Sequence, residues 1–199
     1  MRYLLVFFLV LCFWDVKAQE EAKGYYITLN SDTVYSTYKL KTSPGFFTPA
    51  DNLYEELPVL SQGKEKVKFK PAEIKGFFIE WKDVRAHFIS MPIRKGKQKF
   101  LHIILLSPQL NIYEYSVPTN SGVATQFALH RAEGDTIYVR PDDGNQKTKK
   151  RLKEFFSAQD DILSIMSATK DLFTRPGLVQ YDMGRLVERI LDLYKKKEW

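Results

Sequence analysis

Residues 24–40 read GYYITLNSDTVYSTYKL, and they set the fold class of this chain. The side chains at positions 25, 27 and 29 alternate with those at 26, 28 and 30, which is the period of a β-strand. After the polar pair Ser31 and Asp32, residues 33–40 are again rich in β-branched and aromatic side chains. Two such runs joined by a short polar stretch predict a β-hairpin.

A second ordered stretch begins at residue 64. Residues 42–63 contain three prolines and two glycines, which predict a long irregular connection with room for one short strand. After this connection a lysine stands at every second position: Lys64, Lys66, Lys68 and Lys70. The period of two places these lysines on one face of a strand, with Val67 and Phe69 on the other face.

Three further hairpins are expected downstream. Their paired runs are 74–81 with 84–91 across Lys82 and Asp83, 100–106 with 110–115, and 125–131 with 136–140. Hairpins at this spacing favour an antiparallel β-meander or an open barrel-like sheet, from about Gly24 to about Pro141.

The hydrophobic period becomes helical in the last part of the chain. Residues 147–156 predict an amphipathic helix with a strongly basic outer face. Ser157, followed by Asp160, predicts the N-cap of a second helix, and Asp182 predicts the cap of a last one. The predicted class is therefore α+β. We expect one domain, in which residues 19–141 form the β-rich part and residues 142–199 form two or three helices packed on it.

Residues 1–18 have the pattern of a secretory signal peptide. Arg2 precedes an apolar run over 3–14, and Val16 and Ala18 stand at positions minus three and minus one of a cut after Ala18. We expect cleavage between Ala18 and Gln19 and export to the periplasm or out of the cell. Two alternatives stay open. One is an uncleaved membrane anchor, and the other is lipidation at Cys12, where the preceding Leu11 is larger than such a site prefers.

Cleavage would remove Cys12, the one cysteine of the chain. The exported part would then form no disulfide within itself, so its stability must come from a packed core. Its 28 basic and 23 acidic residues give a formal charge of +5, against +6 for the whole chain. This mild excess suits attraction to anionic envelope polymers and does not indicate a nucleic-acid-binding protein.

Catalytic, metal and cofactor motifs are missing from the sequence. Three histidines lie in predicted strands without partners at zinc-site spacing: His87, His102 and His130. Two carboxylate pairs are typical of a turn and of the first turn of a helix: Asp142-Asp143 and Asp160-Asp161. The chain has no Gly-x-Ser-x-Gly elbow and no glycine-rich phosphate loop. We therefore expect no catalytic residues, no metal site and no cofactor.

Basic side chains support a binding hypothesis. The candidate anion-binding residues are the alternating lysines and a second group near residue 100: Lys64, Lys66, Lys68, Lys70, Arg94, Lys95, Lys97 and Lys99. If the two groups adjoin, they suit an acidic polysaccharide, a lipid headgroup or an acidic partner. The alternative is that the lysines keep an exposed strand soluble and protect its edge from aggregation. Similarly, Tyr26, Tyr35 and Tyr113 either stack on sugars or pack against cross-strand neighbours.

Several short segments resemble a secreted family of Bacteroidetes-type bacteria that has no assigned function. The resemblance lies in the Ala18-Gln19 junction and in residues 24–28, 31–34, 69–77, 100–101, 110–113 and 127–129. The usual glycine of the family before Asp-Thr is Ser31 here, which suggests a different turn geometry. The resemblance implies a secreted or envelope β-rich module with a helical tail, and it implies no catalytic residues.

These observations together favour a non-enzymatic binding or structural module of the bacterial cell envelope. Its expected partner is an acidic envelope polymer or an envelope protein. The alternative is a hydrolase that acts on an envelope polymer through carboxylates from different strands. Nucleic acid is not an expected partner, and membrane contact is expected only through the signal segment before cleavage.

Overall fold

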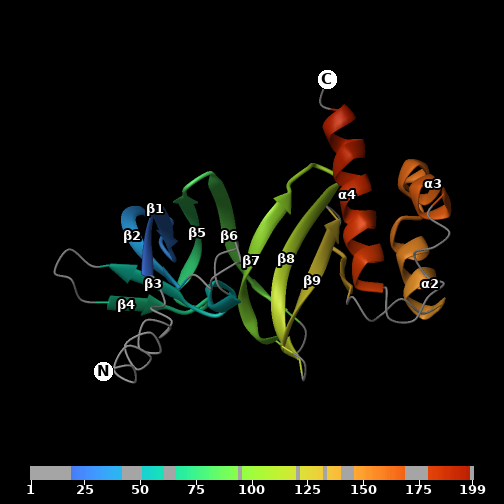
Figure 1. Ribbon diagram of the computed structural model, residues 1–199. Helices are drawn as coiled ribbons and strands as arrows, with labels where there is room; N and C mark the ends of the chain where they lie inside the picture. Colours follow the sequence, from blue (N-terminus) through green and yellow to red (C-terminus); the bar gives the residue numbers. More distant parts are fainter. Residues whose placement is uncertain are drawn as a thin grey trace, which may run out of the picture. The chain divides into compact units, whose positions relative to one another are not determined.

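The computed structural model describes residues 19–41, 51–60, 66–93, 96–119, 122–131, 134–139, 146–168 and 179–197 (Figure 1). Within these residues the chain forms ten antiparallel strands in a meander that does not close, followed by three α-helices. The predicted α+β class is therefore confirmed. The chain divides into two compact units, Met1–Arg85 and Ala86–Trp199, and the division falls inside β6 (Val84–Pro92).

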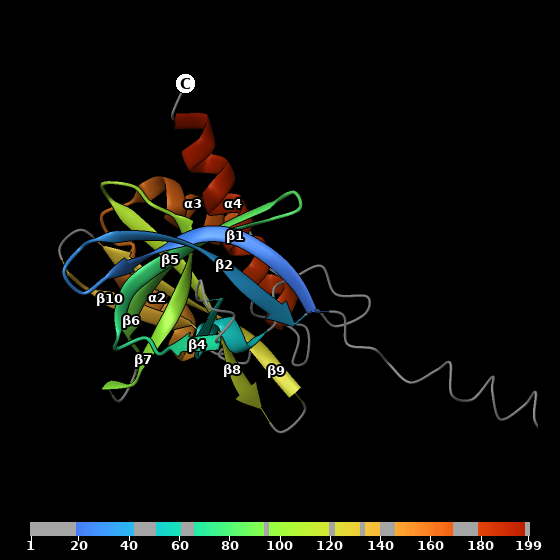
Figure 2. The same cartoon turned by 90° about the vertical axis from the view of Figure 1, so that its left-hand side faces the viewer.

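The described part of the first unit contains β1 (Gln19–Thr28), β2 (Thr33–Lys41), the short 3-10 helix η1 (Asp51–Tyr54), β3 (Leu57–Leu60), β4 (Lys66–Phe69) and β5 (Ile74–Trp81). Its strand order is β5-β1-β2-β3-β4. Figure 2 shows β1 and β2 as two long, curved strands that lie side by side. The predicted hairpin over residues 24–40 is confirmed, and β1 begins earlier than Gly24. The single short strand of the 42–63 connection is β3.

The turn between β1 and β2 is held by Thr28 and Asp32. The Thr28 amide donates to the Asp32 carbonyl at 2.9 Å, and the Asp32 amide donates to the Thr28 hydroxyl at 3.1 Å. Ser31 lies within this turn with a φ of 71°, a left-handed conformation that favours glycine. Ser31 therefore adopts a glycine-like backbone in spite of its side chain, and Lys75 donates to its hydroxyl at 2.6 Å.

One face of the first sheet carries the core of this unit. Tyr38, Phe77 and Ile79 are almost fully buried there. Gly24 lies in β1 between β2 and β5. A Cβ atom at this position would lie 1.9 Å from the backbone oxygen of Phe78 and 2.8 Å from Cε2 of Tyr38. The missing side chain of Gly24 therefore permits the close approach of these groups.

The described part of the second unit contains most of β6, β7 (Gln98–Leu105), β8 (Leu110–Thr119), β9 (Gly122–Arg131), β10 (Thr136–Val139), α2 (Gln146–Phe155), α3 (Asp160–Ala168) and α4 (Val179–Lys197). Its strand order is β10-β9-β8-β7-β6. The two predicted hairpins of this region are confirmed as β7 with β8 and β9 with β10. Neighbours in this order are thus also neighbours along the chain.

The helices pack on one face of β8, β9 and β10 (Figure 1). The shared core consists of Leu110, Ile112, Leu129, Ile137, Val139, Leu152, Phe155, Phe156, Ile162, Met166, Leu186, Val187, Ile190 and Tyr194. Arg131 of β9 also binds the end of α2, because its guanidinium donates to the Phe155 carbonyl at 3.0 Å and lies 4.9 Å from the centre of the Phe155 ring. Burial of apolar side chains from both layers stabilises this arrangement.

Two helix starts differ from the predicted caps. The chain forms a turn over residues 156–158, in which the Ser157 amide donates to the Glu154 carbonyl, and α3 begins only at Asp160. Ser157 is therefore not the N-cap, because the amides of Phe156 and Ser157 still donate back to the carbonyls of Leu152 and Glu154 and α3 starts only after this turn. The prediction for Asp182 is also wrong, because α4 begins at Val179 and Asp182 lies inside the helix.

Candidate functional site

The eight candidate basic residues have different surroundings. Lys64, Arg94 and Lys95 lie outside the described residues, as does the side chain of Lys66. Lys68 and Lys70 are exposed in the first unit, and Lys97 is exposed in the second unit. Lys99 is buried. The two groups thus belong to different compact units.

Lys68 already has an anionic partner within the chain. Its ammonium lies 2.6 Å from the Glu56 carboxylate. Lys68 belongs to β4, which stands at the end of the strand order of the first unit. Lysines on an edge strand discourage pairing with strands of other molecules. The placement of Lys68 supports the alternative, namely that this lysine protects an exposed edge.

Lys99 lies in β7 and does not face solvent. It is only 6% exposed, and its Nζ donates to the backbone carbonyl of Ser116 in β8 at 2.8 Å. The same side of the sheet carries a buried bond from the Tyr115 hydroxyl to Gln126 at 2.9 Å. A buried ammonium needs such a partner because removal of its hydration is costly. Lys99 therefore holds β7 to β8 and does not contribute to an exposed basic surface.

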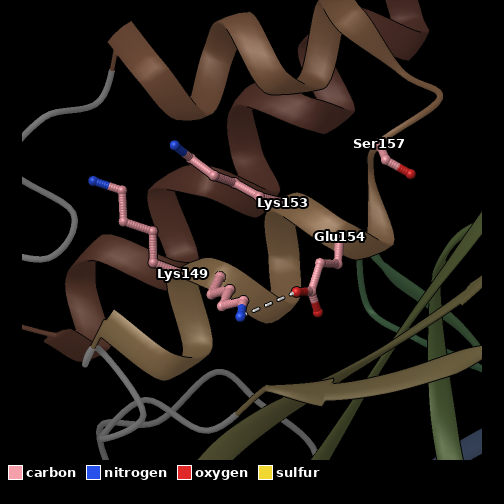
Figure 3. Close-up of a pocket in the computed structure, with 5 residues that line it drawn as sticks. Lys149, Lys153, Glu154 and Ser157 are labelled. Carbon is pink, nitrogen blue, oxygen red and sulfur yellow. Dashed lines mark ion pairs between the residues drawn. The ribbon is translucent and has the colours of Figure 1, made fainter.

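An open pocket of about 470 Å³ lies along α2. It is lined by Lys149, Lys150, Lys153, Glu154 and Ser157 (Figure 3). Thr148 and Leu152 of the same helix are buried, which turns the lysines of α2 outward. Figure 3 shows Lys149 and Lys153 extending in the same direction, as residues four positions apart on a helix do. The helix thus presents a small array of ammonium groups around a hollow.

Positive charge exceeds negative charge in this pocket. Lys150 pairs with Glu154 at 3.8 Å, an interaction drawn as a dashed line in Figure 3. Both side chains of that pair are well exposed, so the pair is worth only about 0–1 kcal/mol. Lys149 and Lys153 add two further positive charges, and Ser157 lines the pocket with a hydroxyl that points away from these two lysines (Figure 3). Such a set attracts carboxylate, sulfate or phosphate groups.

The sequence contains a signal for this pocket, namely the basic outer face of the helix predicted over 147–156. That face alone did not single out a site, because the outer face of an amphipathic helix is ordinarily charged. The pocket requires the position of Ser157 as well, which depends on the tertiary packing of the turn after α2.

The histidines take part in contacts within the second unit. His102 stacks on Phe88 with ring centres 5.2 Å apart, and its Nδ1 lies 3.5 Å from the Glu114 carboxylate. His130 Nδ1 lies 2.8 Å from the Thr136 hydroxyl. Partial burial lowers the pKa of His87, and the nearby His102 lowers it further. Of these contacts, the pair of His102 and Glu114 is the one that the hydrolase alternative would use. The imidazole of His102 packs on Phe88, and the pocket described above is lined by residues of α2 and by Ser157, so this pair does not lie in that pocket.

The paired carboxylates give no support to a metal centre. Asp142 and Asp143 lie outside the described residues. Asp160 and Asp161 occupy the first turn of α3, where the Asp161 carboxylate accepts a hydrogen bond from the next amide at 2.9 Å. Across the described ranges, histidine, cysteine and carboxylate side chains form no group of three or more that could hold a metal ion.

The three tyrosines singled out from the sequence differ in exposure. Tyr113 is buried, and this burial raises its pKa. Tyr26 is half-buried and packs on Phe69 with ring centres 4.8 Å apart. Tyr35 is 80% exposed. Tyr35 therefore remains the one of these three that is open to a ligand.

A membrane-spanning helix is not found among the described residues. Comparisons with protein-family models, with curated proteins and with solved structures gave no match to this chain.

Proposed function

We propose that this chain is an exported, non-enzymatic binding module of the bacterial envelope, and that its α2 pocket binds an anionic polymer. The observation that carries this proposal is the arrangement of Lys149, Lys150 and Lys153 around one hollow, in which Glu154 is the carboxylate among the described lining residues. The formal charge of +5 on the part that follows Ala18 adds a long-range attraction to anionic material.

The openness of the pocket supports a polymer over a small ligand. Exposed ion pairs contribute only about 0.2–1 kcal/mol each, and salt screens them over about 8 Å at physiological ionic strength. A small anion would therefore bind weakly. A polyanion that repeats its charge can bind several ammonium groups of one chain at once, and its contacts add. An acidic polysaccharide has this chemistry.

The test is a double variant, Lys149→Gln with Lys153→Gln. We expect the dissociation constant for polygalacturonate, an acidic polysaccharide probe, to rise roughly fivefold to tenfold, because two exposed charge contacts are lost. Isothermal titration calorimetry at low ionic strength measures this dissociation constant. Added salt should also raise the dissociation constant of the wild-type protein, because salt screens the charge contacts.

The matched control removes the same charge from another helix. Lys195 and Lys196 are exposed near the end of α4, and Lys195→Gln with Lys196→Gln should leave the affinity nearly unchanged. Equal losses in the two double variants would show that only net charge matters. The pocket on α2 would then not be a binding site.

Export is the second part of the proposal, and it rests on residues 1–18. We expect the protein recovered outside the cytoplasm to begin at Gln19, since signal peptidase cuts after small residues such as Ala18. Amino-terminal sequencing of that protein measures the start directly. Recovery with Met1 in place would indicate an anchor, and a lipid-modified Cys12 would indicate a lipoprotein.

A further inference from the structure

The first unit carries a row of aromatic rings on the exposed face of its sheet. Tyr35 of β2, Tyr25 of β1 and Phe78 of β5 are direct cross-strand partners. The ring centres of Tyr25 and Tyr35 are 5.9 Å apart in an edge arrangement, and those of Tyr25 and Phe78 are 5.4 Å apart and stacked. We refer to Tyr35, Tyr25 and Phe78 as the aromatic row.

The aromatic row does not belong to the core of its unit. The core lies on the opposite side of the same strands, where Tyr38, Phe77 and Ile79 are buried. In the aromatic row, Tyr25 and Phe78 are half-buried, and Tyr35 is 80% exposed. Cross-strand pairing explains why Tyr25 packs between its neighbours. Cross-strand pairing does not explain why most of the Tyr35 ring is exposed to solvent.

A row of polar side chains runs beside the aromatic row, two residues away from it on each strand. Lys23 of β1 pairs in register with Thr37 of β2 on one side and with Glu80 of β5 on the other. Side chains two residues apart on a strand point to the same face, so the polar row and the aromatic row share one surface. Arg85 extends the polar row, because its guanidinium lies 2.8 Å from the Glu80 carboxylate.

The chemistry of these two rows fits a carbohydrate. A sugar ring presents an apolar face of C–H groups and a rim of hydroxyl groups, so it needs a flat aromatic surface with hydrogen-bonding groups at its edge. The aromatic row supplies the first, and Thr37, Lys23 and Glu80 supply donors and acceptors for the second. A purely apolar protein partner would instead leave the charges of Lys23 and Glu80 without water, which is costly.

We infer that the aromatic row and its polar neighbours form a carbohydrate-binding platform for the neutral sugar rings of a glycan chain. This site lies in the first unit and is separate from the proposed anion-binding pocket on α2. Tyr35 and Tyr25 stack on sugar rings, and Lys23 and Glu80 bind sugar hydroxyls.

The experiment measures binding of the chain that begins at Gln19 to chitohexaose, cellohexaose and isolated peptidoglycan sacculi. We expect wild-type protein to bind at least one probe, and Tyr35→Ala to weaken that binding about tenfold, which is the loss of one ring contact. Tyr35→Phe keeps the ring and should retain most of the affinity. Leu29→Ala removes another exposed apolar side chain of the same unit, outside the aromatic row, and should leave the affinity unchanged.

Several results would overturn the inference. These are failure of the wild-type protein to bind any of the three probes, equal binding by wild type and Tyr35→Ala, and equal losses in Tyr35→Ala and Leu29→Ala. A change in oligomeric state on size-exclusion chromatography with Tyr35→Ala, without a change in glycan binding, would assign the row to an interface between copies. The double lysine variant of α2 should keep its binding to chitohexaose and cellohexaose, which carry no charge, so failure of one site is distinguishable from failure of the other.

Discussion

Gly24→Ala is expected to unfold the first unit. An alanine Cβ would lie 1.9 Å from the Phe78 backbone oxygen and 2.8 Å from the Tyr38 ring. The nearer of these atoms is backbone within a strand that pairs with β1, so it cannot rotate away as a long side chain can. Overpacking of a core costs about 1–3 kcal/mol even where side chains can shift. We therefore expect a loss of more than about 3 kcal/mol in the free energy of unfolding, measured by urea denaturation.

The matched control for this change is Gly184→Ala in α4. A Cβ at Gly184 meets no atom within 4 Å, so the new methyl group has space. Alanine is favoured over glycine in a helix by about 1 kcal/mol, and this variant should gain stability. Two glycine-to-alanine changes should thus act in opposite directions. A small effect of Gly24→Ala would mean that β1 and β5 can separate without loss of the fold.

Lys99→Ala is expected to lower the free energy of unfolding by about 3 kcal/mol. The change removes a hydrogen bond from a charged donor, worth about 1.5–3 kcal/mol, and leaves the Ser116 carbonyl without this donor. It also leaves a cavity where the long apolar stem of the lysine was packed. Thermal and urea denaturation measure the effect.

Two other substitutions separate the contributions of the charge and of the buried position of Lys99 to the free energy of unfolding. Lys99→Met keeps the volume and loses the charge, so it should cost less than Lys99→Ala, since a buried charge is itself expensive. Lys97→Ala lies two residues away and is exposed, and it should change stability by less than about 0.5 kcal/mol. If Lys97→Ala and Lys99→Ala had equal effects, the buried position of Lys99 would not be important for stability.

The strands were predictable from the sequence because most of their pairings are local. The hairpin over 24–40 needs only alternation and a turn, and both are visible in one short window of sequence. The strand β3 was not placed, because it is a run of only four residues that includes Pro58, inside a connection with two further prolines and two glycines. The caps failed at Ser157 and Asp182 because helix starts depend on packing as well as on capping residues.

The binding surfaces were less predictable for a different physical reason. Alternation shows that Lys99 shares a face with every second residue of its strand, but not whether that face is open. Buried side chains lie on both faces of the sheet in the second unit, because Leu101 and Tyr113 are buried on one side and Ile112 is buried under the helices on the other. Likewise, the sequence places Tyr25 and Tyr35 on the two strands of one hairpin. It does not show that Phe78 lies beside Tyr25, because that contact depends on the pairing of β1 with β5, which is distant in the chain.

The order of strands also has a consequence for how the chain folds. In the second unit every pairing joins strands that follow each other, so each contact closes a short loop and loses little chain entropy. In the first unit, β1 pairs with β5, and Tyr25 meets Phe78 only after the intervening strands have been synthesised. Formation of the aromatic row therefore requires closure of a long loop, which loses more chain entropy than closure of a short one. We expect the first unit to fold more slowly than the second for this reason.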